Sequence, residues 1–198
     1  MTEKPILFSG PMVRAILAGR KTQTRRVVRG SPFDMVRFRG RDNRPTGEYG
    51  WCSHERVISK HMRPPVEVGT RLWVRETYGT RSDLSHVEYR ADRQEPIGLP
   101  FEHIYDEQTK WRPSIFMPRK LSRIDLIVTD VQCQRLQEIT EQDAMAEGFY
   151  QAVAEAPDDI GQDVVGWYAR LWDSINAKRG FPWASNPWVW AYTFKRIL

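Results

Sequence analysis

Hydrophobic positions near the start of the chain follow a helical period. Ser9 can cap this helix and Pro11 suits its first turn, while Gly19 ends it. Residues 22–28 then favour an extended strand. The apolar residues at i, i+3 and i+4 spacing are Met12, Val13, Ile16 and Leu17.

Two further strands are predicted by alternating positions in the middle of the chain. In residues 71–77, Leu72 and Val74 alternate with Trp73 and Arg75. In residues 122–136 the apolar side chains of every second position share one face. These alternating residues are Ile124, Leu126 and Val128.

The last third of the chain predicts two helices and a strand. Thr140 and Asp143 form the pattern of a capping box, and Gly148 ends that short helix. A longer helix carries an apolar stripe and ends near Gly180, and residues 188–197 are expected to form the final strand. The stripe consists of Val164, Trp167, Tyr168, Leu171 and Ile175.

Two long stretches lack clear periodicity. Residues 29–65 are rich in Arg, Gly and Pro and are expected to be an inserted loop region. Residues 78–120 are also irregular, with one strand candidate at 87–90. Few long helices, several strands and no regular β-α-β alternation indicate one α+β domain over residues 1–198, with a curved or closed sheet and helices at its ends.

Composition indicates what kind of protein this domain is and in which compartment we expect it. The chain of 198 residues is 40% hydrophobic and 28% charged, which is a globular balance, and no apolar run is long enough to span a bilayer. The first eight residues lack the features of a secretory signal, so we expect a cytoplasmic protein with free thiols at Cys52 and Cys133.

Charge is distributed unevenly along the chain, although the net charge is only +5. Residues 14–44 contain ten Lys or Arg and two acids, while residues 138–163 contain eight acids and no Lys or Arg. This asymmetry favours a basic face that attracts a phosphate-bearing ligand such as RNA, DNA or a nucleotide. The alternative is that the two segments face one another.

Four short motifs in order resemble the ASCH domain family, small β-barrels related to PUA domains. The first contains Gly19, Lys21 and Arg26 in the pattern Gly-x-Lys-x-x-x-x-Arg, with Thr24 between them. The others lie at residues 69–74, 139–147 and 194–195. The resemblance covers about half of the chain, with residues 29–65 and 78–120 as insertions, and the layout is similar to ASCH-like proteins of phages and prophages.

The resemblance also implies an activity. Small bacterial ASCH enzymes hydrolyse N4-acetylcytidine with a lysine, a threonine and a glutamate, which correspond here to Lys21, Thr24 and Glu147. A threonine hydroxyl needs a base to become a nucleophile, and a lysine can serve if its pKa is lowered. On an extended strand Lys21 and Thr24 would face opposite sides, so they converge only if the strand begins after Lys21 or the chain turns there.

Other interpretations remain open from the sequence. Other ASCH proteins resemble RNA-binding modules or ribonucleases, so a non-catalytic nucleic-acid-binding module is the alternative. A separate, non-functional interpretation of the three candidate residues makes Lys21 a solvated cation, Thr24 an ordinary strand residue and Glu147 an acid on an exposed helix end. The ligand types Cys52, His54 and His61 are too few for a zinc site, and we expect no metal or cofactor.

Further candidates for ligand binding come from charge and aromatic character. Basic groups at a junction between a helix and a strand suit an anion, and an aromatic ring beside a loop can stack on a base. A glutamate on the strand at 71–77 competes with Glu147 as a functional carboxylate, although such a residue more often pairs with an arginine. These candidates are Arg20, Arg25, Arg26, Glu76 and Trp188.

Overall fold

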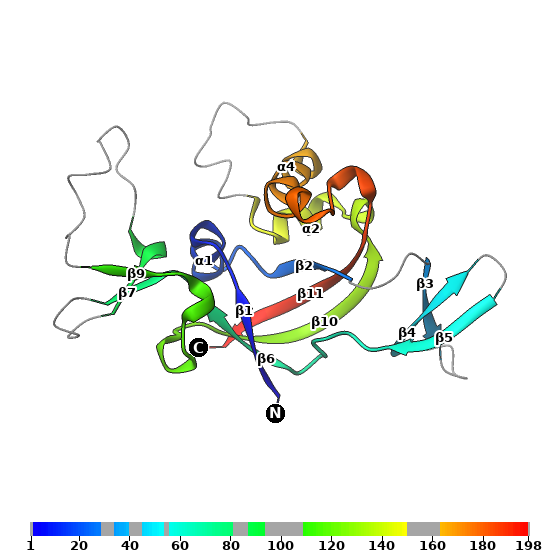
Figure 1. The fold of residues 1–198 in the computed structure, drawn as a ribbon, viewed down its shortest axis with the longest axis horizontal. Coiled ribbons are helices and arrows are strands. Elements are labelled where there is room, and N and C mark those ends of the chain that lie inside the picture. The colour runs from blue at the N-terminus through cyan, green and yellow to red at the C-terminus, as the bar shows by residue number, and fades with distance from the viewer. Residues whose placement is uncertain are drawn as a thin grey trace.

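A five-stranded sheet forms the centre of the molecule (Figure 1). The computed structural model describes residues 2–28, 34–39, 45–53, 56–80, 87–93, 109–149 and 163–197, and between residues 34 and 62 it describes the backbone alone. The strand order is β1-β6-β10-β11-β2. The strands are β1 (Glu3–Leu7), β2 (Gln23–Val27), β6 (Arg71–Arg75), β10 (Asp125–Arg135) and β11 (Trp188–Ile197).

The central sheet is open. β1 pairs with β6 in parallel, the other neighbours are antiparallel, and β1 and β2 are the two edge strands. A register shift between Val128 and Asp130 bends β10, and β10 and β11 curve together beneath the helices (Figure 1). The α+β class is therefore confirmed, whereas the expected closure into a barrel is not seen, because no ladder joins β1 to β2 within the described residues.

Among the described residues, three α-helices lie on this sheet, at α1 (Gly10–Leu17), α2 (Glu141–Ala146) and α4 (Val164–Asn176). Ser9 is extended at the start of α1, Pro11 lies in its first turn, and the left-handed Gly19 (φ 73°) follows its end. Thr140 and Asp143 form the expected capping box of α2. Gly180, with φ 87°, ends the short 3₁₀ turn η7 (Ala177–Arg179) that follows α4.

The expectation of a loop over residues 29–65 was wrong for most of that stretch. Three strands form a separate antiparallel sheet there, at one end of the molecule (Figure 1). These strands could not be predicted from the sequence, because Arg, Gly and Pro interrupt the alternation of apolar and polar residues that identifies a strand. They are β3 (Asp34–Arg39), β4 (Pro45–Ser53) and β5 (Arg56–Met62).

A third sheet, of three short strands, lies at the other end of the molecule. The strand expected at 87–90 is confirmed as β8, and Trp111 packs against Gly79, where a Cβ would lie 3.2 Å from the indole ring. Tyr78 and Tyr89 donate hydrogen bonds to the carbonyls of Phe116 and Leu121. The elements are β7 (Tyr78–Thr80), β8 (Val87–Tyr89), η1 (Arg90–Asp92), β9 (Lys110–Arg112), η3 (Ser114–Phe116) and η4 (Arg119–Leu121).

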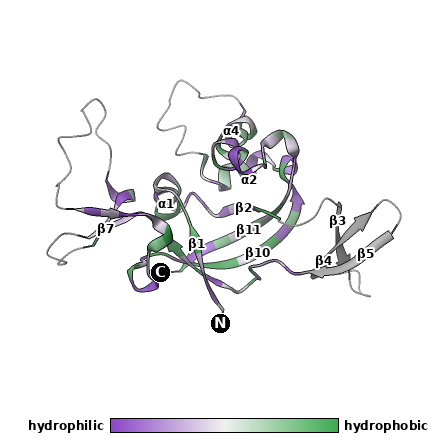
Figure 2. Cartoon of the chain, viewed as in Figure 1, coloured by the Kyte–Doolittle hydropathy of each residue, from purple (hydrophilic) through white to green (hydrophobic). Residues whose placement is uncertain are grey.

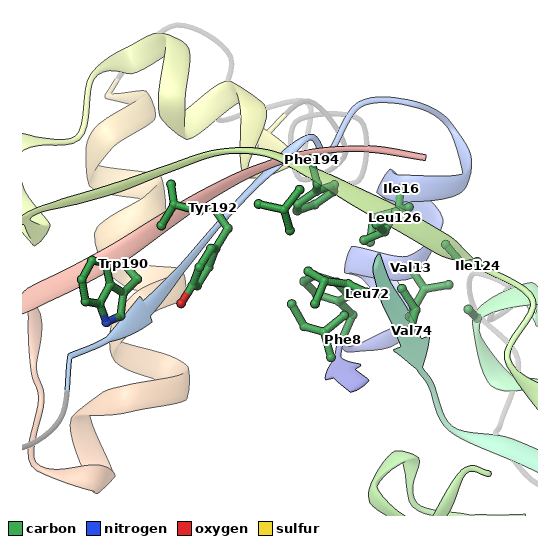
Figure 3. Packing of buried hydrophobic residues seen from close by; sticks show 14 of the residues in the cluster. Phe8, Val13, Ile16, Leu72, Val74, Ile124, Leu126, Trp190, Tyr192 and Phe194 are labelled. Atoms are coloured by element: carbon green, nitrogen blue, oxygen red, sulfur yellow. The ribbon is translucent and has the colours of Figure 1, made fainter. Parts of the chain in front are cut away.

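Two hydrophobic clusters pack on the two faces of β11. The inner cluster joins α1, β6, β10 and β11, and Figure 3 shows Trp190 and Tyr192 at one end of it and Phe8 with Leu72 at the other. The helix-side cluster packs Tyr168 and Trp172 of α4 against Val189 of β11. Hydrophobic residues accordingly follow β10 and β11 in Figure 2. The remaining 3₁₀ turns are η5 (Leu136–Glu138) and η8 (Trp183–Ser185).

Candidate functional site

Lys21 is fixed at the junction between α1 and β2. The backbone N–H groups of Arg20 and Lys21 both donate to the carbonyl of Ala15, at 2.9 and 3.1 Å, after the left-handed turn at Gly19. The strand β2 begins only at Gln23. The structure therefore meets the condition that the strand begins after Lys21, which frees Lys21 from the alternation that governs Thr24.

The end of α2 is fastened to the same junction. Thr22 donates its backbone N–H to the carbonyl of Ala146 at 2.9 Å. Gly148 has φ 108°, and a Cβ built on it would lie 3.3 Å from the Cβ of Ala15 and 3.7 Å from that of Lys21. Only glycine readily combines this backbone conformation with so close an approach, and the result is that Glu147 lies directly beside Lys21.

The ammonium of Lys21 is fully buried and has three acceptors. Nζ lies 2.6 Å from Oε2 of Glu147, 2.8 Å from the carbonyl of Gln23 and 3.0 Å from the carbonyl of Glu147. The side chains of Lys21 and Glu147 are 0% and 4% exposed. The interpretations of Lys21 as a solvated cation and of Glu147 as an exposed acid are thus wrong.

Arg25 approaches Glu147 from the adjacent strand. Its Nη1 donates to Oε1 of Glu147 at 3.2 Å and to Oε1 of Gln23 at 2.6 Å, and its Nη2 lies 3.1 Å from Oδ2 of Asp143. Gln23 donates in turn to Oδ1 of Asp143 at 3.1 Å. Two residues of β2 thereby meet two acids of the α2 segment in one polar network.

Matching repeat distances allow this network to form. Gln23 and Arg25 are two residues apart on a strand, which spans about 6.8 Å. Asp143 and Glu147 are four residues apart, one turn of helix, which spans about 6.0 Å. The opposite charges of the basic and acidic segments therefore face one another at this point, as the second interpretation of the charge asymmetry expected.

Burial shifts the pKa values of two groups around Glu147. Burial lowers the pKa of Lys21, although the charge of Glu147 and its hydrogen bond oppose this shift. Burial also raises the pKa of Tyr168 well above its usual value, and the negative charge of Glu147 adds to that shift. Tyr168 thus keeps its proton, and its hydroxyl donates to Oε1 of Glu147 at 3.5 Å.

Asp143 is the partly exposed member of the network, at 28% exposure. Its partial burial opposes ionisation, but the backbone N–H of Thr140 and the charge of Arg25 hold its pKa below the usual value. Its carboxylate therefore stays charged and serves both the cap of α2 and the network on β2.

Thr24 lies on the other face of β2 from Arg25. It is buried, and its register partner on β11 is Tyr192, a member of the inner cluster. The peptide bond that precedes Thr24 carries the Gln23 carbonyl that accepts from Lys21 Nζ at 2.8 Å. Within the described part of the chain the Thr24 hydroxyl makes no hydrogen bond, so the structure brings Lys21 close to the backbone of Thr24 without joining the two side chains.

Arg20 and Arg26 flank this site. Arg20 is half-buried beside the end of α1. The guanidinium of Arg26 lies 5.6 Å from the ring centroid of Phe8, as does the ammonium of Lys21, and Arg26 Nη2 donates to the carbonyl of Leu7 at 2.9 Å. Arg26 thus connects the edge strand β2 to the end of the opposite edge strand β1.

Glu76 and Trp188 have partners elsewhere. Arg123 binds both carboxylate oxygens of the buried Glu76, at 2.8 and 3.0 Å, and also contacts Asp92, at 2.6 and 2.8 Å. Glu76 is therefore paired with an arginine, the alternative raised for it above. Trp188 lies under the guanidinium of Arg135, 4.6 Å from the ring centroid, and its buried indole Nε1 has no hydrogen-bond partner among the described residues.

Three residues of the site were not predicted from the sequence. Gln23 and Asp143 connect Arg25 to α2, and Tyr168 of α4 donates to Glu147. The pair Gln23 and Arg25 at strand spacing and the pair Asp143 and Glu147 at helix spacing could have indicated the contact. The apolar stripe of the long helix correctly predicts that the Tyr168 ring is buried. A stripe of apolar positions does not show that the Tyr168 hydroxyl donates to Glu147.

Comparisons with family models, with curated proteins and with solved structures find no match for this chain. The described residues contain no group of three side chains able to hold a metal ion, and the side chains of Cys52, His54 and His61 lie outside them. No helix in the described part of the chain is long and apolar enough to cross a membrane.

Proposed function

We propose that this chain is an ASCH-like amidohydrolase that removes an acyl group from the exocyclic amine of cytidine or a related nucleoside. The observation that carries the proposal is the buried 2.6 Å hydrogen bond between Lys21 and Glu147, which are 126 positions apart. These are two of the three residues that the ASCH resemblance identifies, and their side chains suit a base and an acid. Thr24, the assigned nucleophile, follows the peptide carbonyl that Lys21 also contacts.

Hydrogen bonds between the motif segments support the ASCH-like assignment. Thr22, in the first motif, donates its N–H to Ala146 of the third motif and accepts from the N–H of Phe194 in the fourth, both at 2.9 Å. Motifs at widely separated positions thus meet at a single residue. A PUA-like barrel would in addition require the edges β1 and β2 to pair.

The Lys21 and Glu147 pair can supply both catalytic forms by a single proton transfer. Movement of one proton from Lys21 Nζ to Glu147 Oε2 yields a neutral amine and a neutral carboxylic acid. Burial lowers the pKa of Lys21 and so favours its neutral amine. The base and the acid needed for amide cleavage would then arise together, with no change in the net charge of the site.

The reaction would proceed through an ester of Thr24. The hydroxyl oxygen of Thr24 attacks the acyl carbonyl carbon, and its proton passes to the neutral amine of Lys21. The bond from that carbon to the exocyclic nitrogen then breaks, and the nitrogen takes the proton of Glu147. Water hydrolyses the ester, so that one acylated nucleoside and one water give one nucleoside and one carboxylic acid.

Turnover of N4-acetylcytidine, followed by chromatography of released cytidine, tests the proposal. Thr24→Val removes only the hydroxyl and keeps a β-branched residue, and we expect it to lower kcat by at least the roughly 10²- to 10⁴-fold typical of one acid or base group. Lys21→Arg keeps the charge but cannot supply a neutral base, so it should fail similarly. The matched control is Thr22→Val at the exposed neighbouring threonine, which should retain activity.

Two outcomes would contradict the proposal. One is full activity of Thr24→Val or Lys21→Arg in protein that melts like the wild type. The other is a wild type that hydrolyses no acylated nucleoside, in which case the nucleic-acid-binding module becomes the better interpretation.

A further inference from the structure

One edge of the Arg25 guanidinium has no hydrogen-bond acceptor. Nη1 is occupied by Gln23 and Glu147, but Nε and Nη2 are buried without an acceptor among the described residues. Nη2 lies within ion-pair distance of Asp143, 3.1 Å, without hydrogen-bond geometry. Buried polar groups nearly always make a hydrogen bond, so two donors without one on the same edge indicate that an acceptor is missing.

The shape of this edge selects the kind of acceptor. Nε–H and one Nη2–H point in parallel and suit a planar ligand with two adjacent acceptors. Arg25 is 0% exposed, whereas Asp143 is 28% exposed, so the edge lies one side chain away from solvent.

The charges around Arg25 distinguish between a charged and a neutral acceptor. The carboxylates of Asp143 and Glu147 already lie 3.1 and 3.2 Å from the Arg25 guanidinium, so a carboxylate or phosphate bound to the same group would be repelled by two like charges. A pair of neutral acceptors carries no such penalty. Ring N3 and carbonyl O2 of cytosine are two adjacent neutral acceptors in one plane, whereas ring N1 of adenine is followed by a C–H group.

We infer that Arg25 is the specificity-determining residue of the site and binds N3 and O2 of an N4-acylated cytosine, an inference that rests on the proposed function. Glu147 lies between Arg25 and Lys21, with one carboxylate oxygen toward each. In the substrate, N4 likewise lies between the ring acceptors and the acyl carbonyl. With the ring on Arg25, N4 therefore meets the acid, and the acyl group passes Lys21 and the edge of β2 to reach Thr24 on the other face of that strand.

Selectivity between N4-acetylcytidine and N6-acetyladenosine tests the inference. We expect wild-type kcat/KM to favour the cytidine substrate, and Arg25→Lys to reduce that preference about 5- to 150-fold, the range for loss of one bidentate base contact. The lysine keeps a positive charge beside Glu147 but cannot donate along a two-pronged edge. Arg112→Lys makes the same change at an exposed arginine and should leave the preference unchanged.

A binding measurement on the wild type does not depend on the variant folding. Calorimetry with cytidine and uridine should show tighter binding of cytidine, because N3 of uridine carries a proton that faces the donors of Arg25. Equal binding of the two nucleosides, or an Arg25→Lys protein with native melting temperature and unchanged preference, would overturn the inference and assign the donors to a buried water. The proposed function would survive either result, because its own test is hydrolysis of an acylated nucleoside by the wild type and loss of that activity in Thr24→Val and Lys21→Arg.

Discussion

Replacement of Glu147 by glutamine should be severely destabilising. The side chain keeps its shape but loses the negative charge that Lys21 and Arg25 contact at 2.6 and 3.2 Å. Removing one partner of a buried ion pair typically costs about 3–5 kcal/mol, because the other charge stays buried without compensation. For a domain of this size, that loss lowers the melting temperature by roughly 6–20 °C.

The penalty should shrink at alkaline pH. Burial already lowers the pKa of Lys21, and Glu147→Gln removes the charge that opposes this shift. An unfolded lysine keeps its proton up to about pH 10.4, so the folded variant binds fewer protons than the unfolded chain between its own lowered pKa and that value. Stability of the folded form therefore rises with pH across this window, as Lys21 becomes neutral.

Melting curves followed by circular dichroism, at neutral pH and near pH 9.5, measure both effects. Glu141→Gln, at an exposed position in the first turn of α2, is the matched control and should change stability by no more than about 0.5 kcal/mol. Equal melting temperatures for the two variants at neutral pH would refute the importance of the buried pair. A difference between Glu147→Gln and wild type that grows toward pH 9.5 would refute the assigned cause.

Two further substitutions test how the site and the third sheet are held. Gly148→Ala places a side chain at φ 108° and against Ala15, and urea unfolding should show a loss of about 1–3 kcal/mol. Arg123→Met leaves the buried Glu76 unpaired, which should cost about 3–5 kcal/mol at neutral pH. Burial raises the pKa of Glu76, so the folded form binds more protons than the unfolded chain and this penalty should diminish as the pH falls toward 4; a constant penalty would contradict that cause.

Regular elements with a strong local pattern were predicted well from the sequence. The final strand has the bounds 188–197 that the pattern predicts, and the capping box of α2 forms between the expected residues. The edge strand β1 was not predicted, because Glu3–Leu7 contains a proline and its pairing partner β6 begins at Arg71, far along the chain. Long-range pairing of this kind leaves no trace in local periodicity.

The candidate site was predicted only in part, because its contacts also join elements that are far apart in the sequence. The motifs placed Lys21 and Glu147 as candidates, but their direct contact depends on the approach of α2 to the junction before β2, which Gly148 permits. Arg25 was expected to meet a ligand, yet it also pairs with Glu147 and Asp143. Side-chain partners across two elements follow from their packing distance, which the sequence does not contain.

The open edge between β1 and β2 has a consequence for motion. A closed barrel can widen only if a ladder of backbone hydrogen bonds breaks, whereas here Arg26 Nη2 and the Leu7 carbonyl make a side-chain contact across the opening. A hydrogen bond from a charged donor contributes about 1.5–3 kcal/mol, so thermal fluctuations can part the two strands often without unfolding either of them. The β1 and β2 edges can thus separate at this contact while the pairing of β10 with β11 stays intact.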